Sequence, residues 1–197
     1  MTAPVIAPPE VIVRKFLCAG DRLFLNAYEA ELGRRIGQER MALATAWGLK
    51  PHVVQDPKAV LSNHQAGGMA EVAVARWANV WPASKFDDFL FYNLKLAGGD
   101  LVAVQWNDKR KACALDHARE AKRIEKQKEA PDLYIVLTGG FNDTGHPLFE
   151  FVGWTTHAEL LASPVETVKA YGPRWVQDNL HARFELLTCA RGQGYRP

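Results

Sequence analysis

Two short apolar segments carry most of the fold information in this 197-residue chain. The first is LYIVL at residues 133–137, bounded by Pro131 on one side and by Gly139 and Gly140 on the other. Its continuous apolar character is typical of a central strand that is covered on both faces. The second is FEFVGWT at residues 149–155, which we expect to be the last strand of the same sheet. The sequence therefore predicts a β-sheet with residues 133–137 at its centre.

The sequence before these segments predicts more strands and a buried helix. Residues 89–96 and 101–106 are strand-like runs separated by a glycine-containing turn, which is the pattern of a hairpin. Residues 69–80 are rich in apolar residues and predict a largely buried helix. We expect a third strand at residues 111–115 and a polar helix or charged loop at residues 118–129.

A long helix is expected near the N-terminus. Apolar residues recur every three or four positions between Asp21 and Leu49, with Asp21 as the N-cap and Gly48 as the stop. Gly33 and Gly37 each weaken its middle by roughly 1 kcal/mol relative to alanine, so a bend or a break is expected there.

Two helix starts are expected after the last strand. Thr156 and Glu159 are three residues apart, as are Ser163 and Glu166, and both pairs match the capping box. Residues 175–187 are expected to pack back on the sheet. The expected organisation is a tail at residues 1–20, a single domain at residues 21–187 and a second tail at residues 188–197.

Composition narrows the class of protein. The chain is 48% hydrophobic and 23% charged, as in ordinary folded domains, and its formal net charge is only +2. Any affinity for phosphate must therefore come from a local patch. The three cysteines are far apart and predict neither a disulfide framework nor a zinc site. With no signal-peptide pattern and no stretch of roughly 20 apolar residues, we expect a cytoplasmic protein.

Residues 67–154 resemble the core of PD-(D/E)XK nucleases, especially the small phage and prokaryotic members. The Gly67-Gly68 pair opens a helix that carries Glu71, and a β-meander with further acidic residues ends in a Gly-Trp turn into another helix. The resemblance implies a restriction-endonuclease-like α/β fold with a central mixed β-sheet flanked by helices.

The resemblance also implies a metal site. Such enzymes hold a divalent metal with a helix acid, an Asp at one strand and an acid-x-Lys pair on the adjacent strand. Here Glu71 matches the helix acid and Asp88 matches the strand Asp, which assigns both to Mg²⁺, with Mn²⁺ as a substitute. On the adjacent strand Ala103 stands where the acid belongs and Gln105 where the lysine belongs. Gln105 is then expected to orient the attacking water.

A second register of the motif stays open. It places Asp100 at the position of the strand Asp as a metal ligand, Ala114 at that of the acid and Asp116 at that of the lysine. The first register is preferred because Val-Gln-Trp followed by a polar turn resembles the usual strand ending of the family. Lys111 is a candidate for the catalytic cation, supplied from another position.

Each of these residues also has an interpretation in which it plays a structural part and has no role in metal binding or catalysis. Glu71 is otherwise a helix acid that is exposed or paired with Arg76. Asp88 would end a loop, and Asp100 follows two glycines, as turn residues commonly do. Gln105 would contact solvent on an edge strand.

A basic run provides the expected nucleic-acid interface, its alternative being a solvated helix face. The residues assigned to phosphate contacts are Lys109, Arg110, Lys111, Arg119, Lys122 and Arg123. Two functions follow from the resemblance: a metal-dependent nuclease or nuclease-derived DNA-processing protein, or a catalytically inactive module that binds nucleic acid or a protein partner.

Overall fold

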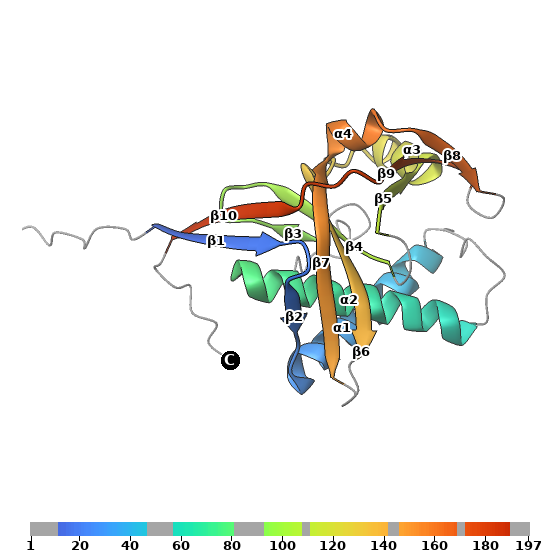
Figure 1. The fold of residues 1–197 in the computed structure, drawn as a ribbon. Helices are drawn as coiled ribbons and strands as arrows, with labels where there is room; N and C mark the ends of the chain where they lie inside the picture. The colour runs from blue at the N-terminus through green and yellow to red at the C-terminus, as the bar shows by residue number, and fades with distance from the viewer. Residues whose placement is uncertain are drawn as a thin grey trace, which may run out of the picture.

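The computed structural model describes residues 12–46, 57–80, 93–107, 111–141, 146–168 and 172–189. Its centre is a mixed five-stranded sheet in the order β2-β7-β6-β4-β3 (Figure 1). The strands are β2 Arg22–Phe24, β3 Leu94–Lys95, β4 Leu101–Trp106, β6 Leu133–Phe141 and β7 Pro147–Thr156. β4 and β6 are parallel, whereas the other neighbouring pairs are antiparallel. The expected α/β fold with a central mixed sheet is confirmed.

The segment LYIVL lies in β6, between β7 and β4. Ile135, Val136 and Leu137 are each 0% exposed. Their side chains alternate between two apolar cores, because Ile135 and Leu137 belong to one and Val136 belongs to the other. The prediction of a central strand covered on both faces is therefore confirmed.

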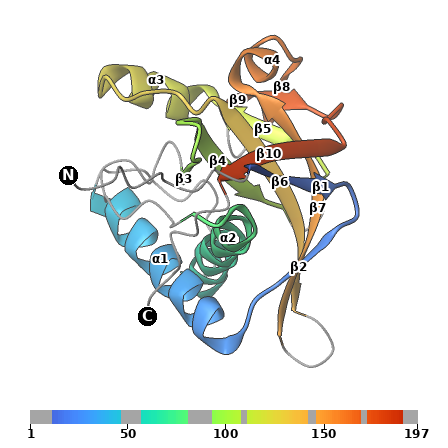
Figure 2. The ribbon, with the colours of Figure 1, turned by 90° about the vertical axis from the view of Figure 1, so that its left-hand side faces the viewer.

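Helix α2 Pro57–Ala78 covers one face of the sheet, and α1 Ala27–Ala46 packs against α2 (Figure 2). Apolar residues of α2 share the first core with Val102 and Val104 of β4. The helix expected at residues 69–80 thus begins earlier, at Pro57, and the Gly67-Gly68 pair lies inside it rather than opening it. The helix ends at Ala78, two residues before the expected end at residue 80.

Glycines bring α1 and α2 into close contact. A Cβ atom built on Gly33 would lie 2.5 Å from Cα of Met69, and one on Gly37 would lie 2.3 Å from the carbonyl oxygen of His64. A Cβ on Gly68 would lie 2.2 Å from the carbonyl oxygen of Gly33. α1 runs unbroken through its two glycines. The break expected from helix propensity is therefore absent, and the missing side chains allow the close packing between the helices.

The first helix begins later than expected. Asp21 is not its N-cap, because residues 22–24 form β2 and pair with β7. Asn26 is at the helix start instead: its Oδ1 accepts from the amide of Glu29 at 2.9 Å, and Oε2 of Glu29 accepts from the amide of Asn26 at 2.8 Å. This reciprocal pair satisfies free amides at the N-terminus. Gly48, the expected stop, lies outside the described residues.

A second layer packs on the opposite face of β4 and β6. It contains β5 Cys113–Asp116, β9 Gly172–Gln177 and β8 Val165–Val168 as a three-stranded sheet, with helices α3 His117–Glu125 and α4 His157–Leu161 (Figure 1, upper right). The strand expected at residues 111–115 is therefore present, but in a different sheet. The polar helix expected at residues 118–129 is confirmed as α3.

The second capping box does not start a helix. Residues 165–168 form β8, which pairs antiparallel with β9. The hydroxyl of Ser163 donates to the carbonyl of Leu160 at 2.6 Å, at the end of α4. Pairing with a neighbouring strand has overridden the local capping signal.

A two-stranded ribbon extends from the body (Figure 1, left). It is formed by β1 Ile12–Cys18 and β10 Arg183–Cys189, which pair antiparallel along their length. Residues 12–18, which fall within the expected N-terminal tail, form β1 in the structure. Leu17, Phe184 and Leu186 of the ribbon join the first core. Within the described residues no helix is long and apolar enough to cross a membrane.

Candidate functional site

Glu71 lies on α2 and is fully buried. Its carboxylate forms an ion pair with the guanidinium of Arg40 on α1, whose side chain is 12% exposed. Burial lowers the pKa of Arg40, and the charge of Arg119 acts in the same direction. Together they lower this pKa to about 9, so the guanidinium keeps its proton at neutral pH. The alternative partner, Arg76, binds Glu29 instead, at 3.0 Å.

Gln105 joins the two layers of the molecule. Its side-chain amide donates to the carbonyl of Ala114 at 2.8 Å, and its carbonyl oxygen accepts from the amide of Ala114 at 3.1 Å. These two bonds reproduce the exchange between paired strand residues and fix β5 beside β4. The side chain therefore serves a neighbouring strand, unlike the solvent contact considered for an edge strand.

Glu71 and Gln105 do not come together. Val102 and Val104 face the core formed with α2, whereas Ala103 lies in the second core. Because side chains alternate along a strand, Gln105 shares the face of Ala103. The helix that carries Glu71 and the side chain of Gln105 are thus on opposite sides of β4.

The other predicted site residues are dispersed. Asp88 lies outside the described residues, as do Lys109 and Arg110. Asp100 is exposed in the turn between β3 and β4, and Lys111 forms an ion pair with Glu150 at 3.2 Å. In the part of the chain that the structure describes, no three His, Cys, Asp or Glu residues are grouped so as to hold a metal ion.

A polar network connects α3 to the sheet. Glu120 of α3 is 7% exposed, and its carboxylate accepts from Nε of Arg123 at 2.9 Å and from a second guanidinium nitrogen of the same residue. Nε2 of His157 lies 3.5 Å from the same carboxylate, and Nδ1 of His157 lies 3.0 Å from the hydroxyl of Tyr134. Arg123 is the largest cause that lowers the pKa of Glu120. Burial raises the pKa of Tyr134.

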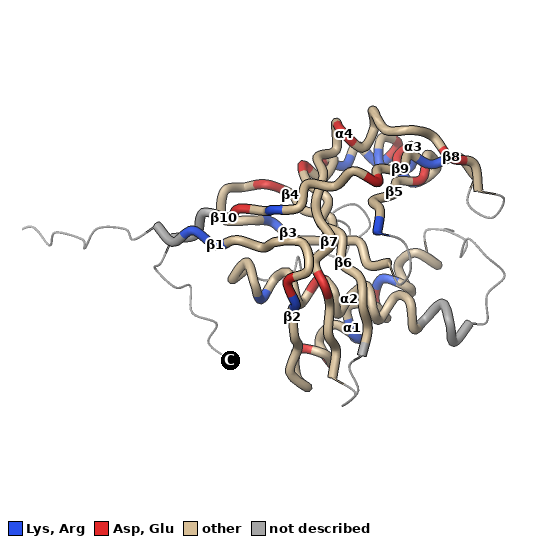
Figure 3. The backbone as a smooth tube through the Cα atoms, in the orientation of Figure 1, with Lys and Arg blue, Asp and Glu red and all other residues tan. Residues whose placement is uncertain are grey.

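Basic residues outnumber acidic ones over α3 and the turn that follows it. Residues 117–128 contain five basic and two acidic residues. Figure 3 shows Lys and Arg interspersed with Asp and Glu in the region of α3. Arg119 and Lys126 are exposed, and Lys122 forms an ion pair with Glu125 at 3.2 Å. In this part of the predicted basic run, Arg123 faces inward, whereas Arg119, Lys122 and Lys126 lie nearer the solvent.

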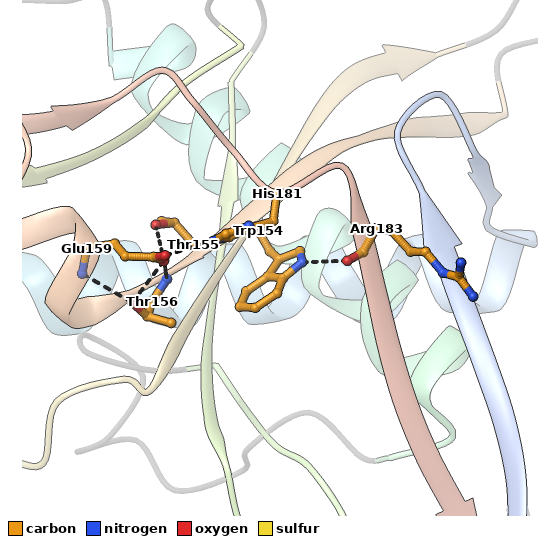
Figure 4. Close-up of polar contacts among 6 residues, drawn as sticks. All are labelled: Trp154, Thr155, Thr156, Glu159, His181 and Arg183. Carbon is orange, nitrogen blue, oxygen red and sulfur yellow. Dashed lines mark hydrogen bonds and ion pairs between the residues drawn. The ribbon is translucent and has the colours of Figure 1, made fainter.

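A second polar cluster begins at the capping box of α4, which is confirmed (Figure 4). The hydroxyl of Thr156 accepts from the amide of Glu159 at 3.1 Å, and the carboxylate of Glu159 accepts from the amide of Thr156 at 2.8 Å. The bond from Thr156 is the largest cause, followed by His181, that lowers the pKa of Glu159 to about 2. Glu159 therefore remains ionised at neutral and mildly acidic pH.

The same cluster attaches the segment between β9 and β10 to the sheet. Nε2 of His181 lies 2.8 Å from the carboxylate of Glu159, and its ring centroid lies 4.6 Å from that of Trp154. The indole of Trp154 donates to the carbonyl of Arg183 at 2.8 Å. Each polar group of this cluster thus has a role in joining β7, α4 and β10.

Sequence reasoning missed the network of Tyr134, His157, Glu120 and Arg123. Only the Glu120–Arg123 pair carries a local signal, because residues three apart are neighbours on a helix. Tyr134 and His157 lie in other elements, and no spacing rule relates them to α3.

No protein-family model matches this chain, and no match was found among curated proteins or among solved structures.

Proposed function

We propose that this chain is a restriction-endonuclease-like module that binds nucleic acid without metal-dependent cleavage. The observation that carries the proposal is the ion pair between Glu71 and Arg40. Metal-assisted hydrolysis of a phosphodiester needs clustered carboxylates to hold the cation. The guanidinium of Arg40 already supplies the positive charge that Glu71 requires, so this carboxylate has little to gain from a metal ion.

The positions that correspond to the acid-x-Lys pair support the same proposal. Ala103 offers no ligand and is 3% exposed within an apolar core. The amide of Gln105 is engaged at both of its polar atoms by Ala114, so orienting a water would require breaking a bond between the two layers. Asp100 and Lys111 belong to exposed parts of the surface.

Nucleic acid is the favoured partner because of α3. Neutralising phosphates with Lys and Arg releases counterions, and this supplies affinity without base contacts. The excess of basic residues over α3 and the turn after it provides that charge on a chain whose formal net charge is only +2. The helix is fixed to the body by Glu120 and His157, which favours a preformed surface over a loose tail.

The experiment measures binding and cleavage together. Fluorescently labelled single- and double-stranded DNA and RNA are titrated with the protein at several salt concentrations, with Mg²⁺, with Mn²⁺ or with a chelator, and the products are resolved on gels. We expect binding that weakens with salt and no cleavage that depends on metal. Cleavage that disappears with the chelator and in a folded Glu71→Gln variant would instead identify an active nuclease.

A matched pair of variants tests the interface. Arg119→Gln/Lys126→Gln removes two charges from α3 and its C-cap, and Arg34→Gln/Arg35→Gln removes two from α1. For duplex DNA we expect the first pair to reduce the salt slope by up to about 1.8, which corresponds to two phosphate contacts. The α1 pair should leave the slope unchanged. Equal effects of the two pairs would refute the assignment of the interface to α3.

A further inference from the structure

Glu120 is an acidic residue that is buried within a basic helix. Its side chain is 9% exposed and that of its partner Arg123 is 16% exposed. Two guanidinium nitrogens of Arg123 donate to the carboxylate, and a third donates to the carbonyl of Lys128 at 2.5 Å. Glu120 therefore fixes the side chain that closes the turn after α3. That turn carries Lys126 and Lys128.

His157 extends this arrangement to the centre of the sheet. Its Nδ1 lies 3.0 Å from the hydroxyl of Tyr134 and its Nε2 lies 3.5 Å from the carboxylate of Glu120. Tyr134 lies on β6, whose neighbours are β7 and β4. A chain of polar contacts thus links the central strand β6 to the end of α3.

We infer that Glu120 is a positioning residue for the nucleic-acid interface of α3. Its carboxylate holds Arg123, and through Arg123 the turn after the helix, so that Arg119, Lys122 and Lys126 are presented together. This inference rests on the proposed function. If the inference holds, removing the negative charge of Glu120 weakens binding. Electrostatics alone predicts the opposite, because a negative charge next to a phosphate-binding surface should weaken binding.

Two charge-matched variants separate positioning from electrostatics. Glu120→Gln and Glu125→Gln each remove one negative charge from α3, but the side chain of Glu125 is 60% exposed and pairs with Lys122 near the surface. Electrostatics alone predicts tighter binding for both. Positioning predicts a dissociation constant about tenfold higher for Glu120→Gln, because a buried guanidinium loses its charged partner. Glu125→Gln should bind up to about threefold more tightly.

A third variant keeps the charge. Glu120→Asp retains the carboxylate but shortens its reach, so electrostatics predicts unchanged affinity and positioning predicts weaker binding. Circular dichroism establishes that each variant is folded. The slope of log affinity against log salt is the decisive measurement, because fewer simultaneous phosphate contacts reduce it, whereas a smaller folded fraction does not.

The outcomes distinguish the two proposals. Weaker binding and a lower salt slope for Glu120→Gln and Glu120→Asp, with Glu125→Gln unimpaired, would establish the positioning role. If the wild-type protein binds and Glu120→Gln gains affinity as Glu125→Gln does, the inference is overturned while the proposed function stands. If the wild-type protein binds no nucleic acid, both are overturned.

Discussion

Two adjacent glycines of α2 give a sharp test of how the helices pack. A Cβ atom on Gly68 would lie 2.2 Å from the carbonyl oxygen of Gly33 and 2.8 Å from the amide nitrogen of Gly37. A Cβ on Gly67 would have no atom within 4 Å. Both glycines are inside the same helix. Replacing each with alanine therefore changes helix propensity equally and changes packing at one position alone.

The expected effects have opposite signs. Alanine in a helix interior gains about 1 kcal/mol over glycine, and this gain applies to both variants. Overpacking costs about 3 kcal/mol at the upper end of its usual range, which suits Gly68 because the obstructing atoms belong to the backbone of α1. Gly68→Ala should thus lose about 2 kcal/mol of stability and Gly67→Ala should gain about 1 kcal/mol. For a chain of this size the melting temperatures should shift by about −4 to −8 °C and by about +2 to +4 °C.

Thermal and urea denaturation followed by far-ultraviolet circular dichroism measure both changes. The dependence of unfolding free energy on urea should be the same for the two variants, because neither alters the surface exposed on unfolding. A shift of the same sign and size for Gly67→Ala and Gly68→Ala would refute the close contact between α1 and α2.

Two further predictions concern buried and capping charges. Arg40→Met leaves the carboxylate of Glu71 buried without its partner, and we expect a loss of about 3–5 kcal/mol in urea denaturation. Arg35→Met, an exposed control on the same helix, should change stability by less than about 0.5 kcal/mol; a comparable loss would contradict the role of the buried pair. Because the pKa of Glu159 is lowered from 4.5 to about 2, its carboxylate contributes stability that is fully present above pH 4.5 and is lost as the pH falls towards 2. The difference in melting temperature between wild type and Glu159→Gln should therefore shrink across that window, and a constant difference would show that ionisation is unimportant.

The sequence predicts continuous apolar strands well, because a run of apolar residues directly indicates burial. The segment at residues 133–137 was placed correctly at the centre of the sheet, and the hairpin turn before residues 101–106 was found from its glycines. Both signals are local. A run of apolar residues must be covered, and a glycine turn between two such runs favours antiparallel pairing.

The two capping boxes show where local reading fails. Thr156 and Glu159 start α4, whereas Ser163 and Glu166 lie at the end of that helix and in β8. A helix cap contributes about 1 kcal/mol, which a few ladder hydrogen bonds and side-chain contacts with β9 can outweigh. The same sequence pattern therefore has two outcomes, and the neighbouring strand decides between them.

The candidate site depended on contacts between distant residues, which is why the sequence identified its members without their partners. Glu71 was identified as a residue with a role, but the partner is Arg40 on another helix, not Arg76 in the next turn. The glycines of α1 were interpreted through helix propensity, although their role is to admit α2. No periodicity in one segment specifies which residue of another segment will face it.

The ion pair between Glu71 and Arg40 would let the proposed module keep its fold without a bound metal ion. A fully buried carboxylate needs a compensating positive charge, which either a metal ion or a guanidinium can provide. With Arg40 on α1 in that role, the stability of the helix layer does not depend on a bound cation. Ala103, on the other side of β4, is then free to complete an apolar core instead of supplying a ligand. On this view the thermal stability of the wild-type protein should be the same with Mg²⁺ and with chelator, because a cation that bound only the folded state would raise it.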